Sequence, residues 1–113
     1  MKGTNTWTGS GNVASDVLYG ETKTGDKACN FKLAIEESHK SLVFIRINVY
    51  AGNVDVCRMR RLKKGDYVVV EGELMNRRGQ DDTITEVRCR KIVIPDRSER
   101  RENQDGSQES GTE

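Results

Sequence analysis

The sequence predicts a small all-β domain over residues 1–95, a five-stranded Greek-key barrel with one short helix between its third and fourth strands. A disordered acidic tail over residues 96–113 is expected to follow it. Three observations support this prediction. Several segments alternate apolar and polar side chains with a period of two, as half-buried strands do. One segment has a helical pattern instead. Residues 96–113 contain no aliphatic or aromatic side chain, so they have nothing to bury.

The first two strands are expected on either side of a turn. Residues 7–19 are rich in Thr, Val and Gly and predict an extended first strand, in which Gly9 and Gly11 mark a bulge or a close backbone approach. A Gly-Asp pair at 25–26 supplies the turn. Residues 28–36 then alternate. Their apolar face consists of Cys29, Phe31, Leu33 and Ile35, and their polar face includes Asn30 and Lys32.

The third strand, residues 42–50, has two very different faces. Its odd positions are β-branched and apolar, so we expect this face to be buried. They are Val43, Ile45, Ile47 and Val49. The even positions place two aromatic rings on either side of a guanidinium and an amide, and we expect this face to meet solvent. These even positions include Phe44, Arg46, Asn48 and Tyr50.

The one helix is expected within residues 53–65. Asn53 is the expected N-cap and Gly65 the residue that stops the helix. Val54, Cys57 and Leu62 should face inward. Five basic side chains gather toward the C-terminal end, where they complement the helix dipole: Arg58, Arg60, Arg61, Lys63 and Lys64.

Two more strands complete the predicted barrel. The fourth, residues 67–74, is expected to bury Val68, Val70 and Leu74, and residues 75–82 should form a charged, exposed loop. The fifth, residues 83–94, puts Val87 and Cys89 on one face against Glu86, Arg88 and Arg90 on the other, and Pro95 ends the domain. This element order is that of an oligonucleotide-binding (OB) barrel. An open antiparallel sheet with one solvated face has the same local pattern.

Charge and cysteine content narrow the class of protein. The net charge is +1, of which the tail contributes −3, so residues 1–95 carry +4, as suits a protein that meets a polyanion. Cys29, Cys57 and Cys89 include no close pair, which argues against a zinc site and a disulfide framework. We expect reduced, buried thiols in a cytoplasmic protein, with no metal and no cofactor. No segment is typical of a signal peptide or a membrane span.

The solvated strand faces and the charged loop together form the candidate binding surface. Base stacking on an exposed aromatic ring contributes roughly 1–3 kcal/mol per base, and basic side chains neutralise phosphates without reading sequence. We therefore predict a platform for single-stranded nucleic acid. Its residues are Asn30, Lys32, Phe44, Arg46, Asn48, Tyr50, Arg77, Arg78, Arg88 and Arg90.

Ordinary structural roles are also open to these residues. Phe44 or Tyr50 could pack under a loop or against another subunit, and the arginines of the fifth strand could protect a sheet edge from aggregation. Trp7 is expected to pack or to form a subunit contact rather than to bind a base. An enzyme is not expected. The sequence lacks the nucleophile-elbow, zinc-protease and phosphate-loop motifs, and its one histidine, His39, has no catalytic neighbour.

Over residues 4–94 the chain resembles the bacterial and phage single-stranded DNA-binding protein family. The matching segments, in chain order, are GNV at 11–13, NFKLAIEES at 30–38, FIRINVY at 44–50, LKKGDYVVVEGEL at 62–74 and TEVRCRKIVI at 85–94. The fourth segment is the most specific of these, and the shared order of all five strengthens the resemblance.

The resemblance implies an OB-fold barrel that associates as a homo-oligomer, a dimer or a tetramer, and binds single strands with little sequence preference. Phe44 and Tyr50 fall on the family's base-stacking positions. The implied role is to coat and protect DNA strands exposed during replication, repair, transfer or recombination. Two alternatives stay open: an OB-fold protein-interaction module of a replication or primosome complex, and an RNA-binding OB protein.

The chain also departs from the family pattern. Ser38 and His39 stand where the family has an aromatic residue, and another aromatic is missing near Gly79, so we expect weaker stacking and relatively more important arginines. The tail ends in SQESGTE without an apolar Pro-Phe tip. Recruitment of partners such as a helicase or polymerase is therefore less strongly implied. A compact variant from a phage, plasmid or other mobile element fits these departures.

Overall fold

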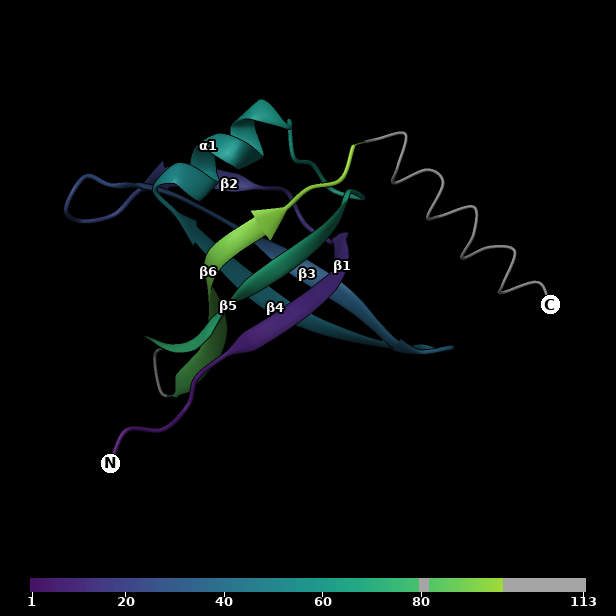
Figure 1. The fold of residues 1–113 in the computed structure, drawn as a ribbon, viewed down its shortest axis with the longest axis horizontal. Coiled ribbons are helices and arrows are strands. Elements are labelled where there is room, and N and C mark those ends of the chain that lie inside the picture. Colours follow the sequence, from purple (N-terminus) through teal and green to yellow (C-terminus); the bar gives the residue numbers. More distant parts are fainter. Residues whose placement is uncertain (80–81, 97–113) are drawn as a thin grey trace.

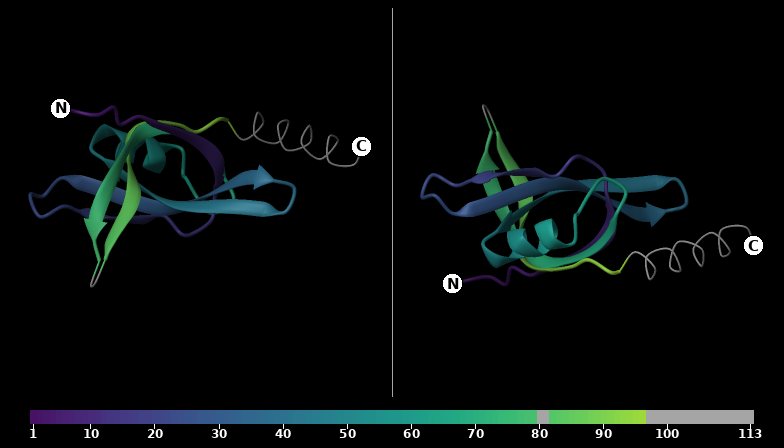
Figure 2. Two further views of the ribbon diagram at one scale, coloured as in Figure 1. Left: turned by 90° about the horizontal axis from the view of Figure 1, so that it is seen from below. Right: turned by 90° about the horizontal axis from the view of Figure 1, so that it is seen from above.

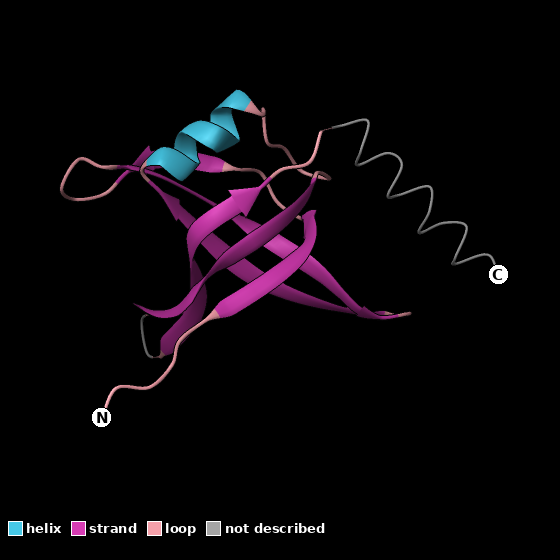
Figure 3. Ribbon diagram, in the orientation of Figure 1, coloured by secondary structure: helices cyan, strands magenta, loops and turns pink. Residues whose placement is uncertain are grey.

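The computed structural model describes residues 1–79 and 82–96 of the chain, and it consists of strands with one helix (Figures 1 and 3). The expected acidic tail lies outside the described residues, except for Asp96. The elements are β1 (Trp7–Val13), β2 (Leu18–Glu21), β3 (Lys27–Ser38), β4 (Ser41–Tyr50), α1 (Gly52–Met59), β5 (Tyr67–Arg78) and β6 (Thr83–Val93).

The strands form a closed five-stranded barrel, as predicted, and not an open sheet. Hydrogen-bonded neighbours follow the order β1, β5, β6, β4, β3, and β1 returns to pair with β3 and closes the ring. The pairs are antiparallel except for β4 and β6, which run parallel where Ile47 and Asn48 face Val87 and Arg88. The short strand β2 pairs antiparallel with the first residues of β3.

The expected first strand over residues 7–19 is split into β1 and β2. β1 pairs with β5 over most of its length and then crosses to β3. A side chain at Gly11 would collide with the backbone of Ala34, so the expected close backbone approach is present here. The corner after β1 is held by Lys32, whose carbonyl accepts from the Ala14 amide and whose amide donates to Ser15 Oγ. Trp7 packs against the core, with its ring over Gly9, as predicted.

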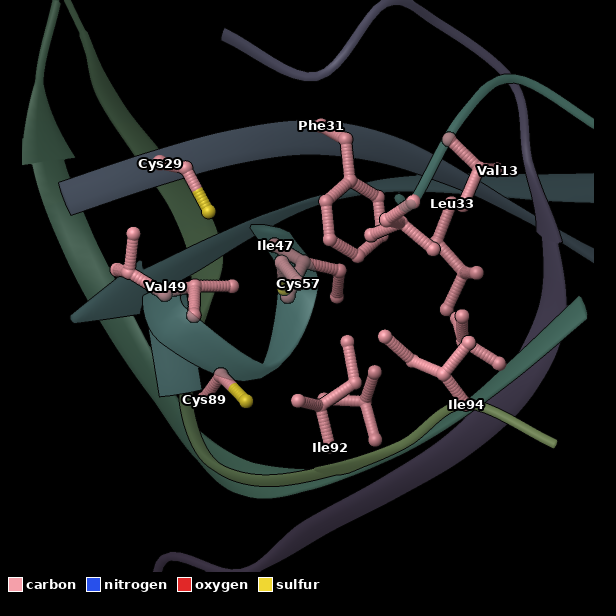
Figure 4. Close-up of a cluster of buried hydrophobic side chains, with 14 of the residues drawn as sticks. Val13, Cys29, Phe31, Leu33, Ile47, Val49, Cys57, Cys89, Ile92 and Ile94 are labelled. Atoms are coloured by element: carbon pink, nitrogen blue, oxygen red, sulfur yellow. The ribbon is translucent and has the colours of Figure 1, made fainter. Parts of the chain in front are cut away.

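The alternating strands place their apolar faces in one core inside the barrel (Figure 4). The predicted inward residues of the second strand are buried or, for Ile35, partly buried. The cysteines are free, buried thiols, also as predicted. Burial raises the pKa of Cys89 to about 12. Other buried members include Phe31, Leu33, Ile47, Val49, Val68, Val70 and Val87.

Helix α1 covers one end of the barrel and contributes Val54 and Cys57 to the core (Figure 1). Asn53 is not the N-cap, contrary to prediction. The chain passes from β4 into the helix through Ala51, which has a positive φ of 54° and makes no side-chain cap. Asn53 therefore lies inside the first turn, where its Nδ2 donates to the carbonyl of Arg90 at 3.1 Å and ties the helix to β6.

Two hairpins, β3–β4 and β5–β6, project beyond the barrel (Figure 2). Burial of the apolar face of β4 was predicted along its whole length, but it fails at Val43, which is 44% exposed. Leu74 was also predicted to be buried and is exposed. Val43 lies where the β3–β4 hairpin has left the barrel. Leu74 lies beyond the last β1–β5 pair, Trp7 with Gly72, although its partner on β6, Val87, is buried. Arg77 and Arg78 belong to β5 and not to a loop, because β5 pairs with β6 as far as Arg78 and Thr83.

Candidate nucleic-acid interface

The outer face of the β3–β4 ladder carries the two predicted base-stacking aromatics. Phe44 lies opposite Ala34 and Tyr50 lies opposite Ala28. On the β3 side, therefore, the cross-strand neighbour of each ring is only a methyl group. Phe44 is 54% exposed and Tyr50 is half-buried. At about 3.3 Å per residue along β4 the two positions are ~20 Å apart, the length of several stacked nucleotides.

Polar pairs fill the ladder between these two rings. Asn30 faces Asn48, and Lys32 faces Arg46. The two pairs are also joined across the strands, because Arg46 Nη1 donates to Asn30 Oδ1 at 2.9 Å. The face between Phe44 and Tyr50 is therefore an ordered strip of two amides and two cations.

Strand β6 extends this strip sideways, and β5 lies beyond it. Arg88 lies on the same face as Asn48, with which it pairs across the parallel strands β4 and β6. On the far side, Glu73 of β5 faces Arg88, and Met75 faces Glu86. The fold thus gathers nine of the ten predicted site residues on one surface. Arg78 is exposed near the end of the β5–β6 hairpin, and alternation directs it away from its neighbour Arg77.

Glu86 is at the centre of this surface, and its burial contradicts the prediction that it is solvated. Its side chain is only 2% exposed. One carboxylate oxygen accepts from Arg77 Nε at 2.8 Å and lies 3.3 Å from Arg46 Nε. The other oxygen accepts from Asn48 Nδ2 at 2.9 Å. Glu86 does project from the polar face of β6, but long side chains from β4 and β5 close over it, so that a buried charge is paired and hydrogen-bonded.

Glu73 forms a second, shallower cluster on the same surface. Its two oxygens accept from Arg88 Nη1 at 3.0 Å and from Arg90 Nη2 at 2.8 Å. Its side chain is 18% exposed. The hydrogen bond from Arg88, together with the nearby charge of Arg90, holds the pKa of the Glu73 carboxyl below its usual range.

The two glutamates change what the predicted cations can do. Arg46, Arg77, Arg88 and Arg90 each pair with a carboxylate, yet each keeps a side chain at least 43% exposed. Lys32 takes no part in the ion pairs found among residues 1–79 and 82–96. The surface is still net positive. Its guanidinium groups are held in place, and Lys32 is the cation that can follow a ligand.

Glu73 and Glu86 were not among the predicted site residues. The sequence does offer an indication of their role. Glu86 shares the polar face of its strand with Arg88 and Arg90, Glu73 lies on the strand next to it, and opposite charges on adjacent strands attract. The register that brings them together is set by the bulge in the β5–β6 pairing, which single-strand alternation does not indicate.

In the part of the chain that the structure describes, no group of three or more His, Cys, Asp or Glu side chains is placed to hold a metal ion. No helix within it has the length and hydropathy of a membrane span. His39 lies in the turn between β3 and β4 and is exposed.

Comparison with known proteins relates this geometry to a family. The model of the single-strand binding protein family matches residues 4–110. No curated protein matches the sequence significantly.

Two solved structures share the fold. The first is the N-terminal domain of PriB protein from Thermoanaerobacter tencongensis, described as dimeric, with a TM-score of 0.66 and 23% identity over 81% of this chain and 97% of that one. The second is a deletion mutant of the single-stranded DNA binding protein from Thermus aquaticus, with a TM-score of 0.69 and 24% identity over 81% of this chain and 41% of that one. The match of the family model along almost the whole sequence, together with the closed barrel, shows that the chain belongs to the single-strand binding protein family.

Proposed function

We propose that this protein binds single-stranded DNA with little sequence preference, coating and protecting strands exposed during replication, repair, transfer or recombination. The observation that carries the proposal is the strip between Phe44 and Tyr50, where two aromatic rings with small cross-strand neighbours flank ordered amides and cations. The role is one of binding without catalysis. Family membership supports it.

Stacking and charge supply the affinity on this surface. Each ring that stacks on a base contributes roughly 1–3 kcal/mol, and every base offers a π-face, so stacking tolerates all sequences. Phosphates are neutralised by Lys32 and by the exposed parts of the four arginines. We expect Asn30 and Asn48 to read little sequence, because the Asn30 oxygen already accepts from Arg46 and the Asn48 amide already donates to Glu86.

Coating follows from mass action. A protein that binds only unpaired strands shifts the equilibrium between duplex and separated strands toward the bound single strand. Hairpins in an exposed strand are removed by the same shift, without any input of chemical energy. This mechanism needs a preference for unpaired strands. We expect the two rings of the strip to supply it, because only unpaired bases have faces free to stack on them.

The test is fluorescence anisotropy of labelled oligo-dT and of a duplex of equal length, each titrated with the full chain at two salt concentrations. We expect tight binding to oligo-dT that weakens as salt rises, by about 0.7 in log affinity per log salt for each phosphate neutralised, and little binding to the duplex. Equal affinity for both, or none for either, contradicts the proposal. Oligo-U in a third titration distinguishes RNA binding, because a preference for it assigns the surface to RNA.

A second candidate function is protein interaction in a replication or primosome complex. It is favoured by the projecting β3–β4 hairpin, on which Leu42, Val43 and Phe44 are all exposed apolar side chains. Salt separates the two candidates. The affinity for a nucleic-acid strand bound through its phosphates falls steeply as salt rises, whereas the affinity for a protein bound through apolar side chains does not.

Assembly and location complete the proposal. We propose that residues 1–95 form the binding domain and that the protein is a homo-oligomer, a dimer or a tetramer, an idea supported by the dimeric PriB domain of the same fold. A replication protein such as a helicase or polymerase is a further partner that we propose. Three free, buried thiols are compatible with a reducing, cytoplasmic setting.

A further inference from the structure

We infer that Glu86 is a positioning residue of the binding surface: it holds the guanidinium groups of Arg46 and Arg77 in the orientation in which they contact a single strand. The inference rests on the proposed function and adds a residue to it. Glu86 touches no ligand itself, since its side chain is 2% exposed. It acts through two arginines whose side chains are 43% and 49% exposed.

Glu86 contacts two arginines that come from the strands on either side of it. Glu86 stands on β6, with Arg46 approaching from β4 and Arg77 from β5. Both arginines direct Nε to the same carboxylate oxygen, at 3.3 Å and 2.8 Å. Because a guanidinium is planar, fixing its Nε edge also fixes the direction of its terminal nitrogens. Those nitrogens carry most of its N–H groups, and the hydrogen bond from Arg77 to Glu86 uses Nε alone.

The remaining contacts make the cluster rigid. Asn48 Nδ2 donates to the second oxygen of Glu86, so the carboxylate cannot turn freely. Arg46 Nη1 donates to Asn30, which fixes its guanidinium at a second point. Four strands, β3, β4, β5 and β6, therefore contribute one side chain or more to a single network. A strand that binds here meets arginines already ordered, so their ordering does not weaken the binding.

Simple electrostatics makes the opposite prediction, and this allows a decisive test. A carboxylate beneath a surface that binds a polyanion repels phosphates, so removing its charge should tighten binding. If Glu86 positions the arginines, removing its charge weakens binding instead, because two like charges are left side by side without the group that orders them. The sign of the change in affinity separates the two accounts.

The experiment compares Glu86→Gln with Glu36→Gln by anisotropy with oligo-dT. Glu36 is exposed on β3 and takes no part in the ion pairs found among the described residues, so its substitution removes the same charge without touching an arginine. We expect Glu86→Gln to lose about tenfold in affinity, a difference of ~1.4 kcal/mol, and Glu36→Gln to bind as tightly as wild type or slightly more tightly. Unchanged or tighter binding by Glu86→Gln overturns the inference.

A second variant keeps the test decisive if Glu86→Gln does not fold. Arg46→Lys with Arg77→Lys preserves both charges but removes the planar group and its Nε donor. We expect the same loss of about tenfold from this double variant, and full retention of affinity overturns the inference. The NMR signals of the arginine Nε–H groups provide a readout without DNA. Two ordered signals in wild type should broaden in Glu86→Gln, and two unchanged signals contradict the positioning role.

The outcome also separates this inference from the proposed function. A wild-type protein that does not bind oligo-dT contradicts the proposed function itself. A wild-type protein that binds, with Glu86→Gln binding equally well, contradicts the role of Glu86 alone.

Discussion

The two halves of β4 differ in what the barrel does to the same alternating pattern. In the half that lies in the barrel, Ile47 and Val49 are fully buried, and Arg46 and Asn48 on the other face are tied to Glu86. In the half that forms the projecting hairpin, Val43 belongs to the apolar face yet is almost as exposed as Phe44 on the other face. Alternation alone therefore does not bury a face. A second layer opposite the strand is also needed.

The largest predicted effect is on stability, in the half of β4 that lies in the barrel. Ile47→Ala removes a fully buried side chain and should lower the free energy of unfolding by about 2–5 kcal/mol. Val43→Ala, on the same face of the same strand, should change it by less than about 0.5 kcal/mol, because Val43 is already exposed. Urea denaturation of both variants is the measurement. Equal losses would show that the hairpin is covered in solution, by a second copy for example.

The second prediction concerns the two rings, one in each half of the strand. Phe44→Ala with Tyr50→Ala should weaken oligo-dT binding by about 1–3 kcal/mol for each ring that stacks. The unfolding midpoint should change little for Phe44→Ala, whose ring is exposed on the hairpin. Anisotropy and thermal denaturation of the single and double variants measure both quantities. Wild-type affinity in the double variant would show that bases do not lie on this strip.

The third prediction compares a cation outside the ion pairs with one inside them. Lys32→Ala should reduce the slope of log affinity against log salt by about 0.7, the value for one phosphate contact on a single strand. Arg90→Ala should reduce it less, because Arg90 contacts a phosphate only in competition with Glu73, to which it is bound at 2.8 Å. Titrations at four salt concentrations provide the slopes. A larger change for Arg90→Ala would mean that its pairing with Glu73 is given up when the strand binds.

The smallest predicted effect is a pH dependence at the Glu73 cluster. The pKa of Glu73 is lower in the folded protein than the ordinary value near 4.5, because Arg88 and Arg90 favour its charged form. A lowered pKa stabilises the fold above the unfolded-state pKa, and this stabilisation is lost as the pH falls through the folded-state value. Between pH 7 and pH 5, Glu73→Gln should therefore have a slightly lower melting temperature than wild type. Plots of melting temperature against pH for the two proteins should converge below about pH 4. Parallel plots at all pH values would contradict the stabilisation of the charged Glu73 by the two arginines.

Much of this architecture follows from local pattern. The period-two alternation of residues 28–36 predicts the burial of Phe31 and Leu33, and the helical spacing of Val54 and Cys57 predicts theirs. Leu62 is buried as well, but it follows the helix, which ends at Met59 and not at the predicted Gly65. The aromatic and basic content of one strand face likewise identifies the surface on which nine of the ten predicted site residues meet. These features depend on neighbours in sequence and on a single partner layer.

The features that sequence reasoning missed depend on several segments at once. The exposure of Val43 is set by where the β3–β4 hairpin leaves the barrel, and that of Leu74 by the end of the β1–β5 pairing at Gly72. No local pattern marks either point. The burial of Glu86 requires arginines from two other strands to close over it. Asn53 is a plausible cap by residue type, but the helix begins earlier, after Ala51 with its positive φ of 54°, and Asn53 therefore lies in the first turn.

The most direct test of the binding surface is to map where a bound strand lies. Ultraviolet crosslinking of the full chain to oligo-dT, followed by mass spectrometry of the peptides, locates the residues in contact with the bases. We expect crosslinks at Phe44 and Tyr50, and a lower yield of both in Glu86→Gln, which binds more weakly. Crosslinks confined to helix α1 or to the exposed apolar face of the hairpin at Val43 would contradict this expectation, and would place the nucleic acid on a different surface of the barrel.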